Sequence, residues 1–341
     1  MTDSCRDPHA GSGLFRSAVS RRTPFAHAAR ALVATAAVFL FASRSEPADA
    51  PAPPPASTRV HTLNVSNKPW TGDFPEILKR KMLRVLVPYS RTLYYTDQGQ
   101  ERGLTAELAR DFEGWVNRKY KTGKRPLTLY LIPTTRDQLL PGLEKGLGEI
   151  AAGNLTITDA RLRHADFVPM TDRNAVREVV VLGSDAEPVE SINDLSGRAV
   201  DVRPASSYFE SLVALNARFH AEGKPPINLQ LVPDALEDED LMEMANAGIV
   251  DVLVVDDWKA KLWAPVLPKI RVVDTFAVRT EGRIGWAIPK NAPKLKAVLA
   301  EFVAKVAAKQ GATAYRLQVA RKRVKDLQNP TRAVGWKRFE Q

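Results

Sequence analysis

The stretch Asn154-Leu-Thr-Ile-Thr-Asp-Ala-Arg161, followed by Asp166-Phe-Val-Pro169, is the most informative part of this chain. It comes after Gly148-Glu149-Ile150, where we expect a strand to end. An arginine guanidinium matches a carboxylate with two parallel hydrogen bonds, and a nearby hydroxyl can complete the shell. Open α/β sheets place ligands at the carboxyl ends of their strands. The stretch therefore predicts a carboxylate site, although an arginine paired with a surface acid would fit the same residues.

This stretch resembles the family 3 periplasmic solute-binding proteins, whose recurring pattern runs roughly xTITxxRxxxxDFxxPY. In that family the hydroxyl and the arginine hold the α-carboxylate of an amino acid. The resemblance implies that Thr156 and Arg161 grip a carboxylate, with Asn154 beside them. The family usually has an aromatic residue after the proline, whereas this chain has Met170.

Strands and helices alternate on both sides of this stretch. Apolar runs predict strands, and apolar residues at helical spacing predict the helices between them. Strands are expected at 83–87, 127–132, 199–202, 229–232 and 252–255, and helices at 104–116, 139–147, 207–219, 237–247 and 295–306. The pattern predicts an α/β fold with two βαβ lobes joined by two crossings. With the resemblance, it implies a bilobed periplasmic-binding-protein type II clamshell whose cleft holds the ligand.

The chain is expected to divide into a leader, a linker, two lobes and a tail. Pro and Ala dominate the linker, so it cannot pack a core. The boundaries expected are 1–43 for a signal peptide, 44–73 for the linker, 74–180 and 275–318 for lobe 1, 181–274 for lobe 2, and 319–341 for a basic tail.

The N-terminus predicts export. Several arginines precede the apolar run at 31–42, which is too short to span a bilayer comfortably but suits a secretory signal. The single cysteine, Cys5, lies upstream of that run, so the mature chain would contain no thiol. We therefore expect a periplasmic protein, held at the inner membrane if the signal is not cleaved.

The charge excess is local and does not indicate a nucleic-acid partner. The net charge is +10, and residues 305–341 alone contain ten Lys or Arg against two acids. The apolar share of 44% is ordinary for a globular chain. The five histidines are scattered without the spacing of metal ligands, and we expect neither a metal nor a cofactor.

Further candidate ligand residues follow later strands. Ser206 and Ser207 open a helix, where free N–H groups favour an anion, but either serine could be a plain N-cap. The resemblance places here a Gly-Thr-Thr-like turn that meets the ligand carboxylate, with Ala205 in place of the glycine. It also implies that Asp256 accepts hydrogen bonds from the α-ammonium, although Asp256 or Asp257 could instead cap the next helix.

Tyr94 and Tyr95 follow the first strand and would either line the cleft or belong to the core. The segments Tyr94–Gly99, Leu241–Gly248 and Val254–Asp257 narrow the resemblance to the solute-binding-like half of membrane-bound lytic transglycosylase F. In that family a lysozyme-like catalytic domain follows the phrase that here reads Asn329–Phe339. The chain ends at Gln341, so we expect no catalysis by this polypeptide alone.

Three interpretations remain at this stage. The first is a monomeric binding protein for an amino acid or short peptide, cell-wall fragments included, that works with an ABC permease or in sensing. The second is the regulatory part of a split or truncated lytic transglycosylase that acts on peptidoglycan. The third is a small enzyme grown on the binding fold, with Asp257 beside Asp256 as the only suggestive acid pair.

Overall fold

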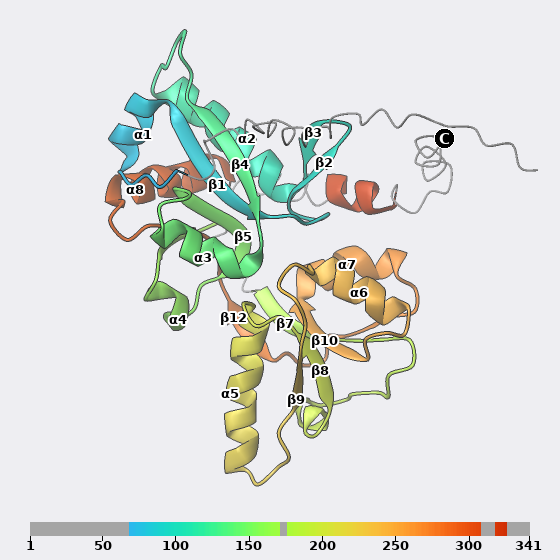
Figure 1. Ribbon diagram of the computed structural model, residues 1–341. Helices are drawn as coiled ribbons and strands as arrows, with labels where there is room; N and C mark the ends of the chain where they lie inside the picture. Colours follow the sequence, from blue (N-terminus) through green and yellow to red (C-terminus); the bar gives the residue numbers. More distant parts are fainter. Residues whose placement is uncertain (1–67, 171–175, 308–317, 326–341) are drawn as a thin grey trace, which may run out of the picture. The chain divides into compact units, whose positions relative to one another are not determined.

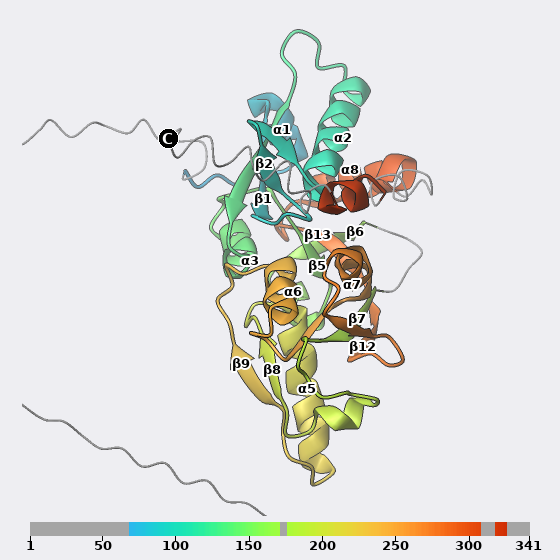
Figure 2. The same cartoon turned by 90° about the vertical axis from the view of Figure 1, so that its right-hand side faces the viewer.

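The computed structural model describes residues 68–170, 176–307 and 318–325 (Figures 1 and 2). The expected signal peptide, the linker up to residue 67 and the tail from residue 326 onwards lie outside the described residues. Within the described part, none of the helices combines the length and the apolar character that crossing a lipid bilayer requires.

Lobe 1 is built on a five-stranded sheet in the order β4-β1-β5-β13-β6. Strands β4, β1 and β5 are parallel, and β13 runs antiparallel to β5 and β6. The elements are α1 (Phe74–Arg80), β1 (Met82–Pro88), β2 (Tyr95–Asp97), β3 (Gln100–Arg102), α2 (Leu104–Lys119), β4 (Thr128–Thr134), α3 (Arg136–Glu144), β5 (Ile150–Thr156), α4 (Asp159–Leu162), β6 (Asp166–Pro169), β13 (Ile284–Ile288), α8 (Pro293–Phe302) and a π-helical turn, η3 (Val303–Ala307).

Lobe 2 repeats this plan. Its sheet runs β11-β7-β10-β8-β9, β12 pairs with β7, and β9, β8 and β10 are parallel. In both lobes, therefore, three parallel strands in the order second-first-third are followed by one antiparallel strand. The elements are β7 (Val176–Leu182), η1 (Ile192–Leu195), β8 (Ala199–Val202), α5 (Ser207–Ala221), β9 (Asn228–Leu231), α6 (Asp238–Asn246), β10 (Val252–Asp256), α7 (Asp257–Trp263), η2 (Ala264–Val266), β11 (Arg271–Val273) and β12 (Arg279–Gly282).

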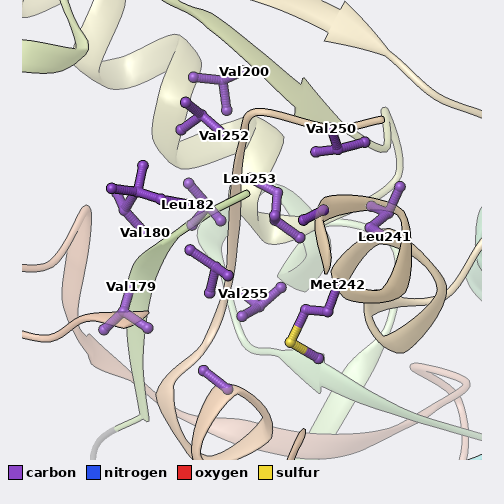
Figure 3. Close-up of a cluster of buried hydrophobic side chains, with 14 of the residues drawn as sticks. Val179, Val180, Leu182, Val200, Leu241, Met242, Val250, Val252, Leu253 and Val255 are labelled. Carbon is purple, nitrogen blue, oxygen red and sulfur yellow. The ribbon is translucent and has the colours of Figure 1, made fainter. Parts of the chain in front are cut away.

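Alternation along the strands buries both faces of each sheet. In β5, Ile150 and Ala152 belong to one hydrophobic cluster, with α2 and α8, whereas Ala151 and Leu155 belong to another, with α3. In lobe 2, β7, β8 and β10 supply valines and leucines to one buried cluster, which also contains Leu241 and Met242 of α6 (Figure 3). These cores fix the strand ends from which the polar residues project.

The structure corrects one strand boundary and the boundary between the lobes. The strand expected to end at Gly148–Ile150 instead begins at Ile150, because Ile150–Gly153 are small or apolar residues buried in the sheet. Asn154 and Thr156 consequently lie on β5 itself, still at its carboxyl end. Strand β7 pairs with β10, β11 and β12 and so belongs to the lobe 2 sheet, although residues up to 180 were expected in lobe 1.

The described part of the expected tail is a helix over residues 318–325 that contacts both lobes. Val324 is buried in the hydrophobic cluster of lobe 2, and Arg323 pairs with Glu107 of α2 in lobe 1. This segment is therefore packed against the lobes.

Asn154 occupies a bulge that aims its side chain towards lobe 2. The register between β5 and β13 shifts between Gly285 and Ala287, and Asn154 has φ 54. Asparagine tolerates this left-handed conformation better than most residues. The bulge re-aims one side chain at the sheet end, as bulges near binding sites commonly do.

A pair of substitutions at Asn154 tests whether the bulge is a backbone requirement. Asn154→Gly and Asn154→Ala both remove the side-chain amide, but only glycine accepts positive φ without strain. We expect the alanine variant to be about 1–2 kcal/mol less stable than the glycine variant in urea unfolding. The same pair at Asn216, inside α5, should show the opposite order, because glycine weakens a helix. An identical order at both positions would contradict the assignment.

Candidate functional site

Arg161 lies at the junction of the two lobes and is buried. The Thr158 hydroxyl caps the single turn α4 that presents it, accepting from Arg161 N at 3.3 Å. Its guanidinium donates to Thr156 O at 3.1 Å and to Ala205 O at 2.9 Å, and its Nε lies 3.0 Å from Glu210 Oε1. Ala205 and Glu210 belong to lobe 2. Burial lowers the pKa of Arg161, and the Glu210 carboxylate offsets part of that effect.

The two serines before and at the start of α5 have different roles. Ser206 is the N-cap: its hydroxyl accepts from Phe209 N at 3.1 Å and donates to Arg203 O at 2.7 Å. Ser207 reaches across the junction and donates to Thr156 Oγ1 at 3.0 Å. The structure therefore brings Ser207, Thr156 and Arg161 together, and it uses Ser206 to start the helix.

Asp256 ends β10 and faces Asn154 from the other lobe. Its Oδ2 accepts from Asn154 Nδ2 at 2.6 Å, while its Oδ1 is buried without a hydrogen-bond partner. Burial is the main cause that raises the pKa of Asp256 to about 6; the nearby carboxylates of Asp238 and Glu178 contribute to this rise, and Lys259 opposes it. Although Asp256 is at the N-cap position of α7, its side chain makes no capping bond.

Asp257 points elsewhere. Its Oδ1 lies 3.4 Å from Arg177 N, and its Oδ2 accepts from Lys261 at 3.2 Å on the next turn of α7. The side chains of the two neighbouring acids therefore have different partners.

A cluster of buried charged residues accompanies the site, and one of its ion pairs joins the two lobes. Arg136 of lobe 1 binds Glu237 of lobe 2 with both ends of its guanidinium, at 2.8 and 2.6 Å, and donates to Gly153 O at 2.7 Å. Asp238 pairs with Arg203 and Lys259. Burial alone would raise the pKa of Asp238, but these cations hold it well below its usual range.

The loop after β1 adds a second set of contacts between the lobes. Ser90 Oγ donates to Glu239 Oε1 at 2.6 Å, and Arg91 pairs with Asp240 and Glu243 at 2.8 and 2.6 Å. Trp263 Nε1 donates to Thr92 Oγ1 at 2.9 Å. The lobes of this structure are thus held together by direct polar contacts.

The two tyrosines for which both the cleft and the core were considered have different surroundings. Tyr94 is buried in the main hydrophobic cluster of lobe 1, which raises its pKa, and its backbone pairs with Ser90. Tyr95 lies on the hairpin strand β2, where burial raises its pKa and the charge of Arg323 lowers it. Over the residues that the structure describes, no group of three or more His, Cys, Asp or Glu side chains is arranged to hold a metal.

Sequence reasoning missed three charged residues of this junction. Arg136 and Glu210 lie on helices whose sequences are those of ordinary amphipathic segments. Glu178 stands inside the apolar strand Val176–Leu182, and a carboxylate in such a run was a usable signal.

Comparison with known proteins gives the same fold and a consistent family. The curated membrane-bound lytic murein transglycosylase F of Desulfosudis oleivorans is 27% identical over 219 residues, or 64% of this chain and 44% of that protein. The chain thus spans less than half the length of this relative. The L-arginine-bound substrate-binding protein AbpA, of an amino acid ABC transporter from Streptococcus pneumoniae, has a TM-score of 0.60 at 20% identity, over 74% of this chain and 99% of that one.

A reconstructed ancestral amino-acid-binding protein, AncCDT-1, described as a precursor of cyclohexadienyl dehydratase, has a TM-score of 0.54 at 21% identity, over 73% of this chain and 97% of that one. These likenesses establish the bilobed clamshell fold. A family model for bacterial extracellular solute-binding proteins, family 3, matches residues 83–316, more than half of the chain. The chain therefore belongs to the bacterial extracellular solute-binding proteins of family 3.

Proposed function

We propose that this protein binds an amino acid or a short peptide between its two lobes and catalyses no reaction by itself. Arg161, Thr156 and Ser207 would hold the ligand carboxylate, and Asp256, oriented by Asn154, would accept its ammonium group. The main support is that a buried guanidinium of lobe 1 and a buried, incompletely paired carboxylate of lobe 2 meet at one junction. A zwitterion satisfies both, and leaving either unpaired is costly.

Glu210 holds the place that a ligand carboxylate would take. Its Oε1 is 3.0 Å from Arg161 Nε, and its side chain is 30% exposed, so it can rotate into solvent. In our proposal the ligand carboxylate replaces Glu210 on the guanidinium. Because Arg161 also binds Ala205 O of lobe 2, the exchange keeps the lobes joined while the ligand enters. A ligand then favours the closed form through contacts with both lobes.

Uptake or sensing outside the cytoplasm fits the family, which is described as extracellular. An ABC permease would be the partner in uptake, and free peptidoglycan fragments would be the ligands in sensing of the cell wall. The signal peptide, expected at 1–43, belongs to the same proposal. Transporter permease genes beside the coding sequence would favour uptake.

A second candidate is the regulatory half of a lytic transglycosylase. Its support is the curated relative of that name, which matches this chain over less than half of its own length. A lysozyme-like coding segment in frame, or in an adjacent gene, would favour it. Purified residues 51–341 should not release soluble fragments from peptidoglycan, and release that depends on this polypeptide would overturn the non-enzymatic assignment.

Removing the guanidinium tests the carboxylate site. Arg161→Ala should weaken amino-acid binding by at least about 30-fold in calorimetry, because truncating one member of a buried charged pair costs roughly 2–5 kcal/mol. The matched control is Arg163→Ala, two residues away and exposed, which should bind as the native chain does. Equal affinity in Arg161→Ala and the control would rule out this site.

Removing the competing carboxylate should have the opposite effect. Glu210→Gln leaves the shape of α5 unchanged but no longer neutralises Arg161, so we expect ligand affinity to rise about fivefold, as for a partly exposed pair of about 1 kcal/mol. Glu222→Gln, at the exposed end of the same helix, is the control. A loss of affinity in Glu210→Gln would show that Glu210 supports the ligand and does not compete with it.

Asp256 should lower stability while serving binding. Its pKa of about 6 exceeds the usual 3.8, so the folded state holds this proton more tightly and loses stability as pH rises from about 4 past 6. Asp256→Asn should therefore be more stable than the native chain at pH 8, by on the order of 1–3 kcal/mol, with the gain vanishing near pH 4.

Urea unfolding at both pH values measures this difference, and Asp257→Asn is the control without such a gain. The same titration predicts that ammonium binding weakens below about pH 6, where Asp256 becomes protonated. A variant Asp256→Asn that is less stable at pH 8 and still binds ligand would contradict the role assigned to this residue.

A further inference from the structure

Glu178 shares the floor of the candidate site with Asp256. The two residues lie directly opposite each other on the antiparallel strands β7 and β10, so their side chains project from the same face of the sheet. That face carries Asp256 towards Asn154 at the lobe junction. Burial lowers the pKa of the Arg161 guanidinium, and the negative charge of Glu178 also acts on this group, in the opposite direction.

Both carboxylates are buried and incompletely paired. Glu178 is 1% exposed, and neither of its oxygens accepts a hydrogen bond, as is also true of Asp256 Oδ1. Arg279 Nε lies 3.3 Å from Glu178 Oε1, but it donates to Ser211 Oγ at 3.1 Å instead. Arg279 therefore supplies charge from one side and leaves the acceptor capacity of Glu178 unused. Like charges directly opposite on a sheet repel, so a cationic ligand group beside the pair would relieve that repulsion.

The charge count at the junction favours one cationic ligand group. Arg84 and Glu149 form their own pair away from the junction. Among the remaining buried charged side chains of the described residues, five carboxylates face four cations: Glu178, Glu237, Asp238, Glu239 and Asp256 against Arg136, Arg161, Arg203 and Lys259. Glu210 and Arg279, whose side chains are each about one-third exposed, add one negative and one positive charge and so do not change this count. A ligand carboxylate that replaces Glu210 leaves this one excess carboxylate, which the α-ammonium of the ligand neutralises. A further basic group is therefore favoured by the unused hydrogen-bond capacity of Glu178 and not by the charge count.

We propose that Glu178 and Asp256 form a two-carboxylate cation subsite that selects amino acids or short peptides with a basic group in addition to the α-ammonium. The inference rests on the proposed function and makes it more specific, because the ligand would carry a net positive charge. Asp256 and Glu178 would each receive one cationic group, and the carboxylate would lie on Arg161. Glu178 is then the residue that sets ligand charge preference.

The test compares ligands that differ only in that charge. The measurement is isothermal titration of the purified chain at pH 7.5. Three pairs of ligands are compared: arginine with citrulline, lysine with norleucine, and alanyl-lysine with alanyl-norleucine. In every pair for which binding is detected, the basic member should bind at least about tenfold more tightly than the neutral one. Glu178→Gln should reduce that ratio to within about threefold. Glu187→Gln, whose side chain is 87% exposed in the same lobe, should keep the native ratio.

Each contrary result has a distinct meaning. Neutral members that bind as tightly as basic ones to the native chain would overturn the cation subsite and leave the proposed function intact. Failure of all six compounds to bind would count against both. A variant Glu178→Gln that unfolds at lower temperature but keeps the native ratio would make Glu178 a structural partner of Arg279 only. Thermal stabilisation by sodium over choline chloride that depends on Glu178, without a ligand preference, would assign the subsite to an inorganic cation.

Discussion

The desolvated guanidinium of Arg161 is the constraint on which this junction depends. A buried cation is stable only when its donors end on acceptors, and here they end on carbonyls and a carboxylate drawn from both lobes. Neither lobe supplies that shell alone. The position of β5, the capped turn α4 and the start of α5 all serve to bring these groups to one point.

The same need for paired charges allows a ligand to replace protein groups at the junction. Most of its charges, such as Arg136 with Glu237, are matched by fixed partners on rigid elements. Two features differ: Glu210 is partly exposed on its cation, and Asp256 and Glu178 keep buried oxygens without hydrogen-bond partners. A ligand can change both features at once, because its carboxylate displaces Glu210 and its cationic groups pair with Asp256 and Glu178. Binding and closure are then one event, because the contacts that recognise the ligand also join the lobes.

The sequence predicted the architecture and the polar ends of its strands, and it could not predict which partners meet there. Apolar periodicity identified the strands of both βαβ series, since each is buried on two faces. The family resemblance implied that Arg161 and Thr156 act together, and the structure places the Arg161 guanidinium in contact with the Thr156 carbonyl. Contacts across the junction, such as Arg136 with Glu237, join residues 101 positions apart, and no local pattern encodes them. The boundary at Ile150 was wrong because small apolar residues continue a strand as readily as they follow one.

A crystal structure of the protein with a bound amino acid or peptide tests the central claim most directly. The account predicts a ligand carboxylate within about 3 Å of the Arg161 guanidinium, Glu210 turned into solvent, and the ligand's cationic groups on Asp256 and Glu178. A ligand held within one lobe, or one bound while Glu210 remains on Arg161, would contradict it.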